Sequence, residues 1–271
     1  MAQNVDIDAY FSRTGYTGGR DAVLEHLRTI VVCHAQAIPF ENLNPLAQLP
    51  VRLDITSLQQ KMIHEQRGGY CFEQNLLLWN VLQQLGFSVS GLTARVVWNA
   101  PDAILPRSHM LLRVELDGET HVVDVGFGGL TLTGVLRLAP DVEQATPHEP
   151  FRLLREGNEW VMQSRIREQW RSLYQFDLQP QVPIDYEPVN WYLSTHPQSR
   201  FVNNLVAARS TPYRRHALFN TELAVHPLNG ETQRRTLQSV DELRRVLSDV
   251  FLIRVPESEQ MDRALFKVFG M

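Results

Sequence analysis

The chain has 271 residues, of which 44% are hydrophobic and 21% are charged, a balance typical of a globular protein with a sizeable core. Its formal net charge of −4 excludes a global basic field that would hold nucleic acid or an anionic membrane. The sequence has no apolar run of about 18 residues that could span a bilayer, and its first residues lack the pattern of a signal peptide. We therefore expect a cytoplasmic protein without nucleic-acid or membrane partners.

Only two cysteines are present, Cys33 and Cys71, and the sequence predicts free thiols in a reducing compartment. There is no Cys-x-x-Cys pair and no His-Glu-x-x-His motif, so we expect no metal site. Cys33 lies in the middle of a helical pattern and is expected in the core.

The first 88 residues indicate helices joined by loops. Apolar residues recur at helical spacing from Asp21 to Gln36 and again from Tyr70 to Leu85, where Gly86 is a typical C-terminal stop. Prolines between these two stretches favour extended backbone, and they are Pro39, Pro45 and Pro50.

From Leu92 the hydrophobic pattern changes to a period of two, which is typical of strands. Strands are predicted over residues 92–98, 108–116, 120–125, 151–154, 159–163 and 171–176. Farther on, residues 216–225 and 232–237 are predicted to form a hairpin around Asn229-Gly230, and Ser239 to Glu242 form a capping-box pattern before a helix over 241–251.

Cys71 follows a flexible two-glycine turn, Gly68-Gly69, and stands at the start of the second predicted helix. Unpaired N–H groups and the positive end of the helix dipole act there, and they favour the reactive thiolate over the thiol. The glycines would also let a substrate carbonyl approach backbone N–H groups closely. The pattern indicates a nucleophile, while a buried structural cysteine remains the alternative.

A histidine and an aspartate are predicted to share one face of a hairpin. Asp117-Gly118 is a favoured two-residue turn that pairs Leu116 with Glu119. His109 and Asp124 then lie diagonally across the two strands on one face, about 7–8 Å apart, within reach of a hydrogen bond. A four-residue loop would preserve this arrangement and a three-residue loop would break it. His121 points to the other face and is excluded.

Asp124 interrupts an apolar run, Val122 to Val125, where a carboxylate is costly unless it is paired. Pairing with His109 would fix the tautomer of the ring and stabilise its cation. A solvated or capped aspartate at a strand end remains the alternative. Cys71, His109 and Asp124 would then form a catalytic triad, with Cys71 as nucleophile, His109 as base and Asp124 as the residue that orients the base. No sequence argument brings Cys71 next to His109.

These residues stand in segments that resemble the arylamine N-acetyltransferase family. The segments occur in the order found in the family: Ile38–Leu43 (IPFENL), Arg67–Asn75 (RGGYCFEQN), Ser108–Met110 (SHM), Asp124–Gly128 (DVGFG) and Asn190–Pro197 (NWYLSTHP). The last 70 or so residues match only loosely.

The resemblance implies an α+β fold with three parts: a helical bundle (1–88) carrying Cys71, a β-barrel (89–190) carrying His109 and Asp124, and an α/β lid (191–271). It also implies a papain- or transglutaminase-like triad and a loop of Phe127, Gly128 and Gly129 near the acceptor and coenzyme A. No cofactor is expected to stay bound. Acetyl-coenzyme A is the implied cosubstrate, and aromatic amines, hydrazines or N-arylhydroxylamines are the implied acceptors.

Arg67 and Glu41 are expected to form a buried or semi-buried pair that joins the cysteine turn to an early helix, and direct contact with the substrate is the alternative role. Three other readings stay open: an amide synthase, a transglutaminase- or protease-like hydrolase with the same triad, and a binding protein without activity. The oligomeric state cannot be read from the sequence.

Overall fold

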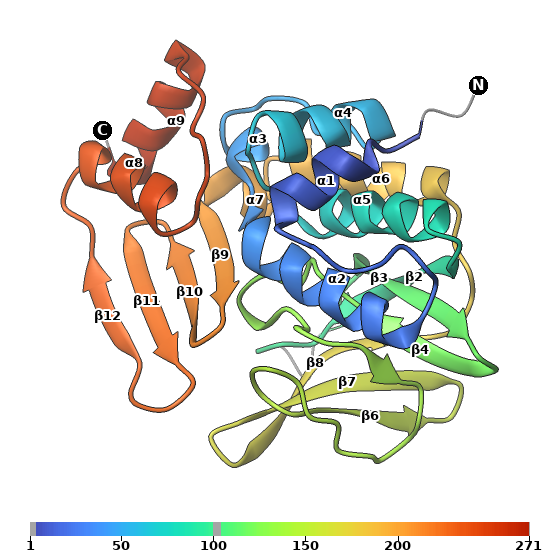
Figure 1. Ribbon diagram of the computed structural model, residues 1–271. Helices are drawn as coiled ribbons and strands as arrows, with labels where there is room; N and C mark the ends of the chain where they lie inside the picture. Colours follow the sequence, from blue (N-terminus) through green and yellow to red (C-terminus); the bar gives the residue numbers. More distant parts are fainter. Residues whose placement is uncertain (1–3, 100–103, 271) are drawn as a thin grey trace.

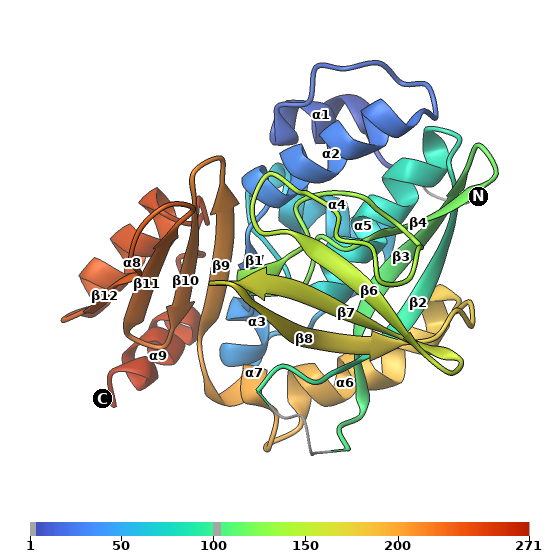
Figure 2. The same cartoon turned by 90° about the horizontal axis from the view of Figure 1, so that it is seen from below.

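The computed structural model describes residues 4–99 and 104–270, and it confirms the predicted α+β class (Figure 1). Helices near the N-terminus pack on a seven-stranded antiparallel sheet that curves into a nearly closed barrel. A second, five-stranded sheet with two helices lies beside them, toward the C-terminus (Figure 2).

The N-terminal helices include both helices expected from the apolar patterns. The predicted helix over 21–36 is α2, and the helix over 70–85 is α5, which is followed by Gly86 with a φ of 87°. The bounds of this region are α1 Ile7–Thr14, α2 Leu24–Ala37, α3 Leu43–Leu46, α4 Ile55–Gln59, a π-helix Gln60–His64 and α5 Cys71–Gln84.

The seven-stranded sheet has the order β5-β4-β3-β2-β8-β7-β6. The segment after β5 reaches β6 at the other edge, where Asp141 N and Gln144 N donate to Leu153 O and Phe151 O, so the sheet nearly closes. The strands are β2 Ser88–Val96, β3 Arg107–Leu116, β4 Glu119–Val123, β5 Leu136–Arg137, β6 Phe151–Glu156, β7 Glu159–Ile166 and β8 Gln169–Phe176, with a 3-10 helix (η2) at Gly128–Leu130.

A connecting segment leads to the second sheet, whose order is β1-β9-β10-β11-β12. It contains a 3-10 helix (η3, Pro183–Tyr186), α6 Glu187–Thr195 and α7 Arg200–Asn203. The sheet and its helices are β1 Phe40–Glu41, β9 Val206–Thr211, β10 Arg214–Phe219, β11 Glu222–Pro227, β12 Gln233–Thr236, α8 Val240–Asp249 and α9 Glu259–Val268.

An early piece of the chain belongs to this second sheet. Strand β1 pairs with β9, with Phe40 opposite Ala208, and the side chains of Leu43 and Leu46 lie in the C-terminal hydrophobic core. Residues 40–47 therefore tie the N-terminal helices to the C-terminal sheet. The division at residues 88 and 190 stays a prediction.

The strand over 216–225 and the place of Cys33 were predicted wrongly. Residues 216–225 are not one strand, because a turn at Asn220-Thr221, with a φ of 52° at Asn220, divides β10 from β11. Cys33 is only partly buried on α2 and packs at the edge of the core. The predicted hairpin around Asn229-Gly230 is confirmed, since β11 pairs with β12.

Within the described residues, no helix combines the length and apolarity needed to cross a membrane.

Replacing Ser239 by Ala should lower the free energy of unfolding by about 1 kcal/mol. The Ser239 side chain accepts a hydrogen bond from Glu242 N at the start of α8, and alanine leaves that N–H without its cap. Denaturant unfolding measures the loss. Ser239→Asp keeps an acceptor and should be nearly neutral, and an equal loss in both variants would contradict the capping role.

Candidate active site

Helix α5 begins at Cys71, and the turn before it is held by close contacts. A Cβ on Gly68 would lie 2.0 Å from Pro39 O, and one on Gly69 would lie 2.8 Å from Glu73 Cβ, so neither position has room for a side chain. Glu73 Oε2 accepts from Tyr70 N and caps the helix start. The Cys71 side chain is 5% exposed, with Sγ 3.7 Å from Ser108 O on β3.

Two carboxylates and two cations are buried beneath this turn. Arg67 Nε donates to Glu41 Oε1 at 2.8 Å, which confirms the predicted pair, although Glu41 lies in strand β1 and not in a helix. Lys61 Nζ lies 2.7 Å from Glu73 Oε1 and 3.8 Å from Glu41 Oε1. The Arg67 guanidinium also reaches Asn44 Oδ1 at 3.0 Å. The four charges compensate one another in the interior.

The two buried carboxylates respond in opposite directions. Burial disfavours the charged form of both, but the neighbouring Arg67 and Lys61 overcome this effect and lower the pKa of Glu41. Burial dominates at Glu73 and raises its pKa, since Lys61 offsets it only in part and the Glu41 carboxylate repels the negative charge. Glu41 therefore holds its negative charge more firmly than Glu73 does.

Helix α5 and the barrel meet at Gly126. A Cβ at this position would lie 2.6 Å from Cys71 Cα and 2.8 Å from Asn75 Nδ2, closer than real Cβ contacts come. The absence of a side chain at residue 126 lets the segment after β4 pass directly against the first turn of α5. This approach places Asp124 and His109 beside Cys71.

The predicted contact between His109 and Asp124 is confirmed, with Nε2 of the ring 2.7 Å from Oδ2 of the carboxylate. The hairpin has the expected two-residue turn, with positive φ at Asp117 and Gly118, and its register pairs Leu116 with Glu119. Because Nε2 faces Asp124, Nδ1 is the ring nitrogen left for Cys71.

The predicted strand over 120–125 is too long, because β4 ends at Val123 and Asp124 lies beyond it. If the ladder continued, Met110 would pair with Val125. The side-chain amide of Asn75 takes this place: Nδ2 donates to Met110 O at 2.8 Å and Oδ1 accepts from Val125 N at 3.2 Å. A side chain of α5 thus replaces a backbone pair and separates the two strands.

Asp124 accepts four hydrogen bonds although its side chain is fully buried. Oδ2 accepts from His109 and from the Tyr174 hydroxyl, at 2.7 and 2.9 Å. Oδ1 accepts from Gly126 N and Asn75 Nδ2, at 2.9 and 3.1 Å. Burial opposes ionisation, but the His109 charge and these bonds outweigh it and lower the pKa of Asp124.

The surroundings of His109 favour the protonated form of its ring. Burial of the ring disfavours the cation, but the Asp124 carboxylate and its hydrogen bond, together with the interaction with Cys71, outweigh burial and raise the pKa of His109 to about 10. A protonated imidazole next to sulfur stabilises negative charge there. The arrangement can therefore hold a thiolate–imidazolium pair and pass one proton.

The loop after Asp124 forms one wall of this site. The Phe127 ring meets His109 edge to face at 5.1 Å between centroids and contacts Tyr174 at 5.0 Å. Gly128, with a φ of 78°, lies over Phe40, and a Cβ on Gly129 would lie 3.9 Å from that of Ala217 on β10. The loop thus lies between the barrel and the second sheet.

Sequence reasoning missed two residues of the site, Asn75 and Tyr174. Asn75 stands four residues after Cys71, so helical spacing places it on the same face as the cysteine, and this signal was available. Tyr174 lies in a predicted strand, but nothing in the sequence pointed it toward Asp124, because β8 joins β2 from far along the chain.

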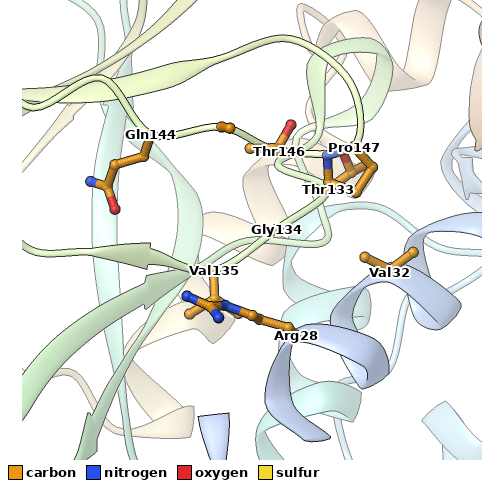
Figure 3. A pocket seen from close by; sticks show the side chains of 9 residues that line it. Arg28, Val32, Thr133, Gly134, Val135, Gln144, Thr146 and Pro147 are labelled. Carbon is orange, nitrogen blue, oxygen red and sulfur yellow. The ribbon is translucent and has the colours of Figure 1, made fainter. Parts of the chain in front are cut away.

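A pocket of about 390 Å³ lies elsewhere, between α2 and the loops around β5 (Figure 3). Arg28 and Val32 line it from the helix, and Thr133, Gln144 and Thr146 are among its other residues. None of Cys71, His109 and Asp124 lines this pocket. The hydroxyl of Thr146 and the amide of Gln144 already bond to backbone groups of the chain.

Comparison with known proteins shows the family to which this chain belongs. The profile of a family described as N-acetyltransferase matches residues 23–260, so the class is that of the N-acetyltransferases. A relative from Mycobacterium tuberculosis, named arylamine N-acetyltransferase, is 43% identical over 258 residues, which cover 93% of this chain and 91% of the relative. The chain belongs to the arylamine N-acetyltransferase family, and it is an acyltransferase with that activity.

Two further similarities extend this result. A relative from Salmonella typhimurium, named arylamine N-acetyltransferase / N-hydroxyarylamine O-acetyltransferase, is 42% identical over 206 residues, covering 76% of this chain and 73% of the relative. The solved structure of Mycobacterium marinum arylamine N-acetyltransferase in complex with CoA superposes with a TM-score of 0.93 at 38% identity. It covers 97% of this chain and 99% of that one.

Gly126→Ala should lower both thermal stability and activity, because the added methyl would overlap Cys71 Cα and force α5 away from the barrel. Overpacking of this kind costs about 1–3 kcal/mol. Thermal unfolding and initial rates measure the two effects. Gly129→Ala is the matched control for stability, since its methyl would meet Ala217 at ordinary contact distance. Equal stability of the two variants would contradict the steric argument.

Arg67→Met should destabilise the protein by about 3–5 kcal/mol, because it leaves the Glu41 carboxylate buried with the more distant Lys61 as its remaining cation. Adding Glu41→Leu should recover part of the loss. A double-mutant cycle by denaturant unfolding measures the coupling. Additive effects would show that the pair does not interact.

Proposed function

We propose that Cys71 is the nucleophile that carries the acetyl group, His109 the acid and base, and Asp124 the residue that orients His109. The observation that carries this proposal is the buried His109 ring, with Nε2 2.7 Å from Asp124 Oδ2, beside a cysteine at a helix N-terminus. The donor is acetyl-coenzyme A, which is released as free coenzyme A and does not stay bound.

In the first half-reaction, the Cys71 thiolate attacks the acetyl carbonyl and the carbon–sulfur bond to coenzyme A breaks. The leaving thiolate takes the proton of the His109 imidazolium and departs as coenzyme A. N–H groups of the first turn of α5 have no acceptor within the helix and suit the developing oxyanion. One thioester replaces another, so the step is nearly balanced in energy.

In the second half-reaction, an arylamine attacks the acetyl-Cys71 thioester. His109, now neutral, accepts a proton from the amine nitrogen, and Cys71 leaves as a thiolate. The thiolate–imidazolium pair is thereby restored. Arylamines, arylhydrazines and N-arylhydroxylamines suit this scheme, because weakly basic aromatic nitrogens are largely uncharged at neutral pH.

The loop of Phe127, Gly128 and Gly129 is the proposed contact for the acceptor and the pantetheine chain of coenzyme A. Its support is the position of the Phe127 ring against His109 and the absence of side chains at two successive, half-buried glycines. The complex of the Mycobacterium marinum relative with CoA supports the choice of donor.

Incubation with acetyl-coenzyme A without an acceptor should add one acetyl group to the wild-type chain, measured as intact mass. Cys71→Ala should show no adduct, while Cys33→Ala should be acetylated like the wild type, because only Cys71 stands beside His109. A folded wild-type protein without adduct would contradict the donor. Acylation by larger thioesters alone would favour an amide synthase, and hydrolysis of amide substrates would favour a hydrolase.

Asp124→Asn should reduce acetyl transfer on the order of 10³–10⁴-fold, because an amide cannot hold the imidazolium in its orientation. It should also lower the pKa of His109 from about 10, since the carboxylate charge that opposes burial is lost. In the resting wild-type protein, the raised pKa of about 10 keeps His109 protonated at neutral pH. In the variant the ring should lose the proton at lower pH.

Histidine NMR titration between about pH 6 and 9 measures this change. His34 is an internal reference, because burial lowers its pKa to about 4 and it should stay neutral in both proteins. An unchanged His109 titration, or a near-normal rate, would make Asp124 a structural residue only.

A further inference from the structure

Arg215 is the largest fully buried side chain among the residues that the structure describes, and it lies on β10, in the second sheet, with 2% of its surface exposed. Its Nη1 donates to Thr131 O and to Ser210 Oγ, both at 3.0 Å. Nη2 and Nε both donate to the Glu149 carboxylate, at 2.7 and 2.9 Å from Oε2. One guanidinium therefore joins the second sheet to two segments of the barrel region.

A buried guanidinium is expensive to desolvate, and a methionine of similar length would fill the volume without that cost. Arginine offers a rigid fork that matches a carboxylate and a carbonyl at the same time. Burial disfavours ionisation of Glu149, but the charge of Arg215 outweighs it and lowers the pKa of Glu149. The pair is thus ionised, and its geometry fixes the two segments relative to β10.

A neutral histidine makes a second link between the same parts. His148 Nε2 lies 2.8 Å from Thr211 O, a group that only accepts, so Nε2 carries the hydrogen and Nδ1 accepts from the Thr133 hydroxyl at 2.8 Å. Burial, and then the charge of Arg215, lower the pKa of His148 and keep this neutral form. Thr131 and Thr133 are therefore both held by the β9–β10 hairpin.

The loop that begins at Phe127 is consequently fixed at both ends by different parts of the fold. The segment just before it is held beside Cys71, since Gly126 N donates to Asp124 and Val125 N to Asn75, and its end is held at Thr131 by Arg215. The 3-10 helix between these anchors, η2, contacts β1, β9 and β10. The position of this wall of the site depends on the second sheet as well as on the barrel.

We propose that Arg215 is a positioning residue for donor binding: by holding Thr131 and Glu149, it sets the place of the Phe127–Leu130 loop against which the coenzyme A chain lies. This inference rests on the proposed function of that loop. It gives the C-terminal sheet a part in the first half-reaction, although that sheet supplies none of the three reacting side chains.

Arg215→Met should lower kcat/KM for acetyl-coenzyme A about tenfold or more, since a displacement of 1 Å in a positioning element can cost up to a hundredfold. Acylation of Cys71 by p-nitrophenyl acetate should stay within about twofold, because this ester has no coenzyme chain for the loop to hold. Arg215→Lys keeps the charge but not the fork, so its effect should be intermediate.

Arg209→Met is the matched control. Arg209 lies on the neighbouring strand β9, is partly buried, and donates to Gln36 O and Val250 O at 2.8 and 3.0 Å. Its loss should lower thermal stability without selective damage to the use of acetyl-coenzyme A. The double variant Arg215→Met/Glu149→Leu removes the orphaned carboxylate, so it should regain stability and keep the selective defect.

The outcomes separate this inference from the proposed function. A selective loss with acetyl-coenzyme A, seen with Arg215 variants and not with Arg209→Met, supports the positioning role. Equal losses with both donors, no loss with either, or the same selective loss in Arg209→Met would overturn it. A wild-type protein that acetyl-coenzyme A does not acetylate would contradict the proposed function, and this inference with it.

Discussion

Removing the Asp124 carboxylate from water is unfavourable unless hydrogen-bond donors replace the water that it loses. Four donors from separate parts of the fold do so: the His109 ring on β3, the Tyr174 hydroxyl on β8, the Asn75 amide on α5 and Gly126 N. Each donor is in place only when its element is docked. The arrangement of helix α5 and the barrel strands around Asp124 is therefore a condition for burying the charge at all.

The same requirement explains why the strands separate at the site. Asn75 takes over the backbone groups of Met110 and Val125, which frees the segment at Gly126 to pass against Cys71. A regular ladder would have kept Asp124 in the sheet and left no room for the first turn of α5. The site thus lies where the pairing of β3 and β4 ends and the Asn75 side chain of α5 takes the place of the next backbone pair.

The C-terminal sheet is joined to this centre from two sides. Strand β1, which carries Glu41, pairs with β9, and Glu41 neutralises Arg67 beneath the cysteine turn. On the other side, Arg215 holds the end of the loop that covers His109. The sheet therefore reaches the nucleophile through the buried Glu41–Arg67 pair and the histidine loop through the buried Arg215 guanidinium, and both tolerate little displacement because an unpaired charge in the interior is costly.

The sequence by itself determined the two main helices, most strands, the Asp117-Gly118 register and the shared face of His109 and Asp124, because these features depend on neighbours along the chain. It also carried the family resemblance that the comparisons confirmed. Tertiary structure alone decided that Cys71 lies beside His109, that Asn75 and Tyr174 complete the Asp124 environment, and that residues 40–47 join the C-terminal sheet. These contacts join residues far apart in sequence, and periodicity holds no information about which distant elements dock.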